Sequence, residues 1–193
     1  MGSLALSGRE KITFVCSPEI AAFGSWVEQL IAESTGKEGK GILPVEGEDV
    51  AAPSRYGNDR LFVYLRLEGT RGSGLDAKVT RLERSHPVVT IRLQDLYDLG
   101  GEFFRWEFAT AVAGAVIGVN PFDQPNVQES KDYTKQLLEE YKVAGALPED
   151  EPISSDAGVE LYGDAATASV LKGSESLAAA LKAYLSRFQK GDY

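Results

Sequence analysis

The fold is decided by a strand and a helix that follow one another in residues 11–36, KITFVCSPEIAAFGSWVEQLIAESTG. Residues 11–17 form a short apolar run that ends at Pro18, which predicts a strand. After Glu19 the apolar residues recur at steps of three and four, as in an amphipathic helix. They are Ile20, Phe23, Trp26, Val27, Leu30 and Ile31. Gly36 is a suitable C-cap, so this helix is expected to end there.

The pattern beyond Gly36 extends this pair into an α/β sheet. Further strands are predicted at 41–45, 61–67 and 88–93, and further helices at 75–82, 100–118 and 127–143. Alternating strands and helices favour crossover connections, so we expect a three-layer α/β sandwich with a mostly parallel sheet and helices on both faces. The helix at 100–118 is apolar on most faces, and we expect it to be central and buried, with Glu102, Arg105 and Glu107 on its polar edge.

The ends of the chain differ from this central part. Residues 1–10 are predicted to be a polar leader or a cloning remnant, and residues 11–145 the main domain. Residues 146–193 are predicted to be an acidic linker followed by an extension with a strand at 159–162 and a closing helix at 175–189. No internal repeat is present in the sequence.

Composition excludes several classes of protein. The net charge of −9, with scattered basic residues, argues against a nucleic-acid partner. The single cysteine, Cys16, excludes an internal disulfide and a multi-cysteine metal site, and a reducing cytosol is the expected compartment. No apolar run approaches the roughly 20 residues of a membrane span. We therefore expect a soluble, cytoplasmic protein that takes no metal.

Glu33 is the first candidate for chemistry, because it lies in the last turn of the helix that ends near Gly36. A carboxylate can remove a proton from the carbon beside a carbonyl and return it to the neighbouring carbon, which is what an aldose–ketose isomerisation needs. The alternative is a solvated ion pair with Lys37, four residues further on, and from the pattern alone this is the commoner explanation.

Gln124 and Lys131 form a second candidate pair, seven residues apart. A lysine can contact a sugar oxygen, donate a proton or hold a phosphate, although a surface lysine on an amphipathic helix gives the same pattern. Because Pro125 interrupts the helix, the two side chains need not share one face. His86, the only histidine, precedes the strand at 88–93. Sites in open α/β sheets form at the carboxyl ends of strands, so we expect His86 to be structural or solvent-facing.

Two segments resemble active-site signatures of the phosphoglucose isomerase family: residues 28–41, EQLIAESTGKEGKG, and residues 120–131, NPFDQPNVQESK. The resemblance extends over roughly 11–144, is to the second sugar-isomerase (SIS) domain, and implies a flavodoxin-like fold. It implies interconversion of glucose 6-phosphate and fructose 6-phosphate through an enediol, without a cofactor. Glu33 falls on the catalytic base and Lys131 on the active-site lysine. Gln124, Lys37 and Ser34 fall on substrate-binding positions.

The sequence also departs from that family. Asn126 and Gln128 stand where glycine and glutamate are usual, the family's upstream phosphate loop and Gly-Gly-Arg signature do not occur, and residues 45–67 hold no histidine. Residues 100–131 look closest to the isomerase part of transaldolase/phosphoglucose isomerase fusions. The expectation is therefore a fragment of such a fusion that is poorly active alone. Its expected partners are a sugar phosphate and the missing first SIS and transaldolase domains, with homodimerisation as a further option. The rival hypothesis is a SIS module that binds a sugar phosphate and catalyses nothing.

Overall fold

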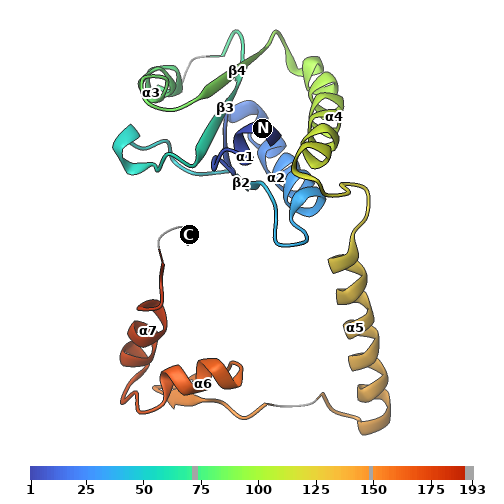
Figure 1. Ribbon diagram of the computed structural model, residues 1–193, viewed down its shortest axis with the longest axis vertical. Helices are drawn as coiled ribbons and strands as arrows, with labels where there is room; N and C mark the ends of the chain where they lie inside the picture. The colour runs from blue at the N-terminus through green and yellow to red at the C-terminus, as the bar shows by residue number, and fades with distance from the viewer. Residues whose placement is uncertain (71–73, 148–149, 190–193) are drawn as a thin grey trace. The chain divides into compact units, whose positions relative to one another are not determined.

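The computed structural model describes residues 1–70, 74–147 and 150–189, and the chain divides into two units on either side of the Lys131–Asp132 bond. The larger unit holds most of the regular structure (Figure 1). Its elements are α1 (Gly2–Ala5), β1 (Lys11–Cys16), α2 (Ala22–Thr35), β2 (Leu43–Val45), β3 (Arg60–Leu67), α3 (Leu75–Leu82), β4 (Val88–Leu93) and α4 (Leu99–Ile117). Short 3-10 turns lie at Pro18–Ile20, Pro53–Arg55 and Leu96–Asp98. Helix α5 (Pro125–Ala144) begins in the larger unit and ends in the smaller one.

The four strands of the larger unit form one parallel sheet in the order β2-β1-β3-β4. Side chains alternate between the two faces of a strand, and β3 is buried on both. Its Leu61, Val63, Leu65 and Leu67 pack on one face, and Phe62 and Tyr64 pack on the other. The predicted strands and the predicted three-layer α/β fold are confirmed.

Different helices cover the two faces of the sheet (Figure 1). Helices α2 and α4 supply apolar side chains to the larger core, in which Phe14 of β1 meets Trp106 of α4 edge to face. Helix α3 covers the opposite face through Val79 and Leu82. The crossover from β1 to β2 and the crossover from β3 to β4 run in opposite directions along the sheet, so right-handed connections place α2 and α3 on opposite faces.

Helix α4 is not buried on all sides, and the prediction of a central helix was wrong in this respect. Phe104 and Phe108 are 70% and 64% exposed, and Val112 and Val116 continue the same exposed row at four-residue spacing. Glu102, predicted at the polar edge, is buried. A helix that is apolar all round offers no contrast between its faces, so its pattern cannot tell which side the sheet will cover.

Both ends of the chain contain regular structure. Within the stretch predicted to be a leader, residues 2–5 form α1, and Met1, Leu4 and Ala5 pack against the larger core. In the smaller unit, β5 (Ser154–Asp156) pairs with β6 (Val159–Leu161) as an antiparallel hairpin, followed by α6 (Ala165–Leu171) and α7 (Leu177–Leu185). The strand and closing helix predicted there are confirmed as β6 and α7.

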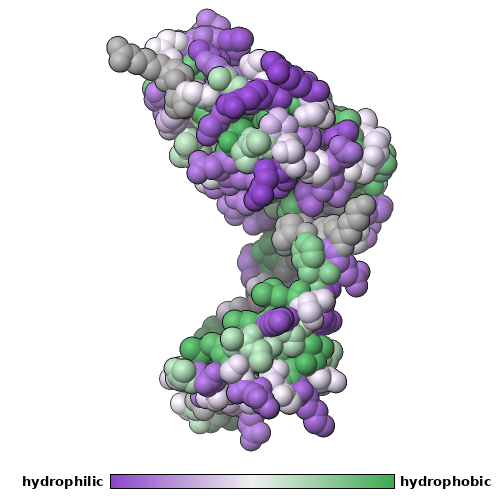
Figure 2. All heavy atoms as spheres, turned by 90° about the vertical axis from the view of Figure 1, so that its left-hand side faces the viewer, coloured by the Kyte–Doolittle hydropathy of each residue, from purple (hydrophilic) through white to green (hydrophobic). Residues whose placement is uncertain are grey.

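Surface character differs between the two units. The face of the larger unit turned toward the viewer in Figure 2 is mostly hydrophilic, whereas hydrophobic side chains gather on the smaller unit. Leu185 and Phe188 in the smaller unit are each 67% exposed. Within residues 1–70, 74–147 and 150–189, no helix is long and apolar enough to cross a membrane.

Candidate active site

The two signature segments meet at the amino ends of the strands. Helix α2 begins after the carboxyl end of β1 and runs back along the sheet, so Thr35 lies close to the start of β2. Helix α4 runs back from the carboxyl end of β4 in the same way. The turn after α2 and the connection from α4 to α5, residues 118–124, are therefore brought to the same edge of the larger unit (Figure 1).

Lys37 joins these two segments. Its ammonium Nζ donates to the main-chain oxygen of Asn120 at 2.8 Å, to the main-chain oxygen of Asp123, and to Asp123 Oδ1 at 2.8 Å. The Lys37 side chain is only 4% exposed. Burying an ammonium is costly unless it is paired and hydrogen-bonded, and here all three N–H groups have acceptors. We call this set of contacts the Lys37 clamp.

The clamp replaces the ion pair between Glu33 and Lys37 that the spacing allowed. Glu33 Oε1 instead accepts a hydrogen bond from Gln29 Nε2 at 3.1 Å, one turn earlier on α2. The surface-pair explanation of these two residues is therefore wrong. Sequence reasoning missed Asp123 as the partner, because it lies far along the chain and four-residue spacing offered a local one.

Asp123 is held from its other side as well. Asn120 Nδ2 donates to Asp123 Oδ2 at 3.1 Å, and Asn120 Oδ1 accepts from the main-chain N–H of Phe122, also at 3.1 Å. The hydrogen bond from Lys37 is the main cause that lowers the pKa of Asp123 below its ordinary value. A carboxylate so placed stays ionised at neutral pH, and the clamp therefore contains one full positive and one full negative charge.

The turn after α2 is shaped by its own sequence. Thr35 is fully buried, and its hydroxyl donates to Ile31 O at 2.8 Å and accepts from Ile42 N at 3.0 Å, which ties the end of α2 to the approach to β2. In the loop between α2 and β2, Lys37 and Lys40 pair as an isolated antiparallel β-bridge. This bridge closes a tight turn whose central residues, Glu38 and Gly39, have φ of 57° and 69°. Such a turn favours glycine at both positions, and only one is present here.

Gln124 directly precedes α5, and Lys131 lies on the second turn of that helix. Pro125 is the first residue of the helix, where its missing N–H group breaks no hydrogen bond, and Gln128 N donates to Gln124 O at 3.2 Å. The helical spacing therefore continues through the proline. Both side chains line an open depression of about 420 Å³ together with Asp123, Val127 and Gln128.

Glu33 and Ser34 lie on the last turn of α2, exposed and half-buried respectively. Neither Glu33 nor Ser34 is among the described residues that line the depression beside α5. The structure thus brings Gln124 together with Lys131, and it connects the Glu33 segment to them through the Lys37 clamp rather than through a shared cavity.

His86 also lies at the amino edge, just before β4, so its position along the sheet does not separate it from the candidate site. Its burial does. The side chain is 7% exposed, its Nε2 donates to the main-chain oxygen of Pro53 at 3.1 Å, and its ring packs edge to face on Phe62 and Tyr56. These contacts give His86 a structural role.

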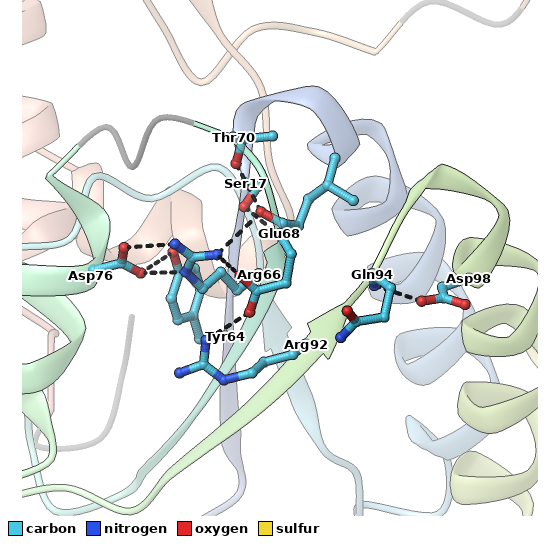
Figure 3. A network of polar contacts seen from close by, with 10 residues as sticks. Ser17, Tyr64, Arg66, Glu68, Thr70, Asp76, Arg92, Gln94 and Asp98 are labelled. Carbon is cyan, nitrogen blue, oxygen red and sulfur yellow. Dashed lines mark hydrogen bonds and ion pairs between the residues drawn. The ribbon is translucent and has the colours of Figure 1, made fainter.

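A second polar group lies at the carboxyl ends of β3 and β4 (Figure 3). Arg66 donates to both oxygens of Asp76, at 2.9 and 3.2 Å, and to Glu68 at 2.6 Å. Glu68 also accepts from Arg92 at 2.8 Å, and Asp76 from the Tyr64 hydroxyl at 2.9 Å. Burial, followed by the bond to Asp76, raises the pKa of Tyr64 to about 12, so this phenol stays protonated. The charges are paired within the cluster, and we assign it a structural role.

That cluster escaped sequence reasoning, although a signal was present. Arg66 and Arg92 occupy matching positions of neighbouring parallel strands, which places both side chains on the same face of the sheet. Within the described ranges, no group of three or more His, Cys, Asp or Glu side chains is arranged to hold a metal ion.

Comparisons with known proteins agree with the resemblance of the two signatures. The chain is 28% identical over 174 residues to glucose-6-phosphate isomerase of Leptospira biflexa, an alignment that covers 71% of this chain and 39% of that enzyme. It is 30% identical over 172 residues to a probable glucose-6-phosphate isomerase of Methanococcus maripaludis, covering 70% and 39%. The chain thus spans well under half the length of the curated relatives that it matches.

Structure comparison supports the fold. A crystal structure of a hypothetical protein from Thermus thermophilus superposes with a TM-score of 0.55 at 22% identity, covering 71% of this chain and 44% of that one. No protein-family model matches the chain. The structure comparison thus shows the α/β fold, and the curated relatives support a glucose-6-phosphate-isomerase-like family for this chain.

Proposed function

We propose that this chain is the part of a glucose-6-phosphate isomerase that carries the catalytic base, and that it interconverts glucose 6-phosphate and fructose 6-phosphate within a longer protein. The Lys37 clamp is the observation that carries the proposal. It fixes the turn after Glu33 against the residues just before Gln124. Two segments that resemble one active site in sequence are thereby held at one edge of the domain.

Each residue has a distinct task in this proposal. The Glu33 carboxylate takes the proton from C2 of the open-chain aldose while O1 gains a proton, which gives the enediol; Glu33 then delivers its proton to C1 while O2 loses its proton, which gives the ketose. Lys131 is exposed and carries a positive charge toward the sugar oxygens, where negative charge develops. Gln124, which lines the same depression as Lys131, can donate a hydrogen bond to a sugar hydroxyl through its amide. Ser34, one residue after Glu33, is proposed to bind the substrate as well.

The remaining parts of such an enzyme belong to the proposal too. Because the chain spans 39% of the Leptospira relative, we propose that other segments of a parent protein supply phosphate binding. The sequence of residues 100–131 resembles that of transaldolase fusions, so we propose such a fusion as the parent protein. We propose that it is located in the cytoplasm. Binding of a remote phosphate orients the reacting carbons, and its loss lowers turnover as well as affinity. The 193-residue chain alone is therefore proposed to be poorly active.

Turnover by the full parent protein tests the proposal. Fructose 6-phosphate conversion is followed with a coupled glucose-6-phosphate dehydrogenase, in the wild type and in Glu33→Gln. Loss of a general base costs on the order of 10²- to 10⁴-fold in rate. Glu28→Gln makes the same chemical change on the same helix and serves as the control. A parent protein without isomerase activity would refute the proposal, and so would a Glu33→Gln variant within twofold of wild type.

The rival function is that of a SIS module that only binds sugar phosphates. The same variants distinguish it from the proposed isomerase activity. A binding module has no use for a carboxylate beside C1 and C2. It would bind fructose 6-phosphate equally well with Gln at position 33, and it would show no turnover in either form.

A further inference from the structure

We propose that Lys37 is a positioning residue, which acts by holding the α4–α5 connection in place rather than by binding substrate. This inference rests on the proposed function, because it assigns Lys37 a part in the same reaction. It replaces the substrate-binding role that the sequence resemblance implied for this residue.

The geometry leaves the Lys37 ammonium no spare donor. It has three N–H groups, and they meet three acceptors, all in residues 120–123. The side chain is 4% exposed, whereas Glu33 and Lys131 are exposed. A sugar phosphate could reach Lys37 only by breaking a buried, charge-assisted contact, and such contacts are among the stronger ones in proteins.

The acceptors make the contact a constraint on the main chain. Two of them are backbone oxygens, those of Asn120 and Asp123, and they bracket the turn that leads into α5. Asp123 is followed at once by Gln124, whose carbonyl accepts the bond from Gln128 in the first turn of the helix. Fixing Asp123 therefore fixes where α5 begins, and with it the positions of Gln124 and Lys131.

The segment that connects Lys37 to Glu33 is also short. Lys37 follows Glu33 by four residues, in the turn just after α2, and Thr35 anchors the residues between them through its buried hydroxyl. The clamp thus sets the distance between the catalytic base and the two residues proposed to contact the sugar oxygens. Displacing a catalytic group by about 1 Å can lower the rate 10²-fold, so a loosened clamp should act mainly on kcat.

Kinetics of Lys37→Met and Asp123→Asn in the parent protein test the proposal, with fructose 6-phosphate as substrate. Each variant should lower kcat about 10- to 100-fold and change KM less than about threefold. The double variant should be no worse than the poorer single one, because residues that act as one unit are not additive. Lys40→Met is the matched control. Lys40 also donates to this connection, at Gly118 O and 3.1 Å, but from the surface, and its variant should stay within twofold.

Hydrogen exchange separates this inference from the proposed function. Exchange of the amides in residues 118–128 should speed up in Lys37→Met and in Asp123→Asn but not in Lys40→Met, whether or not the parent is active. If the parent proves inactive, the proposed function fails, and unchanged exchange would overturn the clamp as well. In an active parent, a Lys37→Met variant with a raised KM and normal kcat, alongside a silent Asp123→Asn, would show that Lys37 binds substrate. Asp123 is 54% exposed, so Asp123→Asn should fold even if Lys37→Met does not.

Discussion

Two buried threonines of the larger unit should respond to the same substitution with opposite signs. Thr110 on α4 and Thr35 on α2 are 2% and 0% exposed. The Thr110 hydroxyl has no hydrogen-bond partner among the described residues, whereas the Thr35 hydroxyl bonds to Ile31 O and Ile42 N. Threonine to valine replaces a hydroxyl by a methyl of nearly the same size. The comparison therefore isolates the hydrogen bonds from packing.

The magnitudes follow from those contacts. A buried hydroxyl without a partner costs about 1–3 kcal/mol, and Thr110→Val removes that cost while it buries one more methyl, worth about 0.8 kcal/mol. We expect the free energy of unfolding to rise by about 2–4 kcal/mol, the sum of these two contributions. Thr35→Val leaves the Ile42 N–H buried and unpaired, so the free energy of unfolding should fall by about 1–3 kcal/mol or more.

Urea unfolding followed by tryptophan fluorescence measures both effects. The two tryptophans, Trp26 and Trp106, belong to the larger unit, so the signal reports on that unit alone. Valine and threonine have similar helix propensities, which removes a trivial explanation. A Thr110→Val protein that is less stable than wild type by more than about 1 kcal/mol would refute the reasoning.

Three further predictions concern the same unit. Trp106→Ala should lower the free energy of unfolding by about 3–5 kcal/mol, because it empties a packed site. Phe108→Ser, on the exposed face of α4, should change the urea midpoint little. Equal losses of stability in the two variants would contradict the assignment of the buried and exposed faces of α4. The hydrogen bond from Lys11 lowers the pKa of Asp59, so the stability that this pair contributes is present above about pH 4 and lost as the pH falls through the folded-state pKa. The difference in unfolding free energy between wild type and Asp59→Asn should shrink on acidification, and a difference independent of pH would exclude the pair. Burial raises the pKa of Cys16 to about 12, so iodoacetamide at pH 8 should label the unfolded but not the native chain, as mass spectrometry would detect; rapid native labelling would contradict the burial.

The strands and helices could be predicted because their patterns are local. Residues 11–17 are apolar and end at a proline, and the helix that follows shows clear three- and four-residue spacing up to Gly36. Both were found as expected, as β1 and α2 with Gly36 as the C-cap. The parallel direction of the four strands, which the alternation of strands and helices predicted, was also found.

Long-range polar partners could not be predicted in this way. Nothing near Lys37 in the sequence points to Asp123, because their contact depends on two helices that both run back to the amino edge. Likewise, the pattern of α4 could not show which of its apolar faces the sheet would cover, and Glu102 was placed on the wrong side for that reason. The roles of Glu33, Gln124 and Lys131 stay predictions, supported by the resemblance and by the clamp beside them.

Proton transfer by Glu33 is the central claim, and deuterium exchange measures it most directly. Fructose 6-phosphate is incubated with the parent protein in D₂O, and deuterium at C1 of the ketose and C2 of the aldose is followed by NMR. A carboxylate base exchanges its proton with solvent while the enediol exists, so the wild type should introduce deuterium at both carbons. Glu33→Gln should do so at least about 100-fold more slowly, and Glu28→Gln at the wild-type rate. Deuterium incorporation by Glu33→Gln at the wild-type rate would contradict the account.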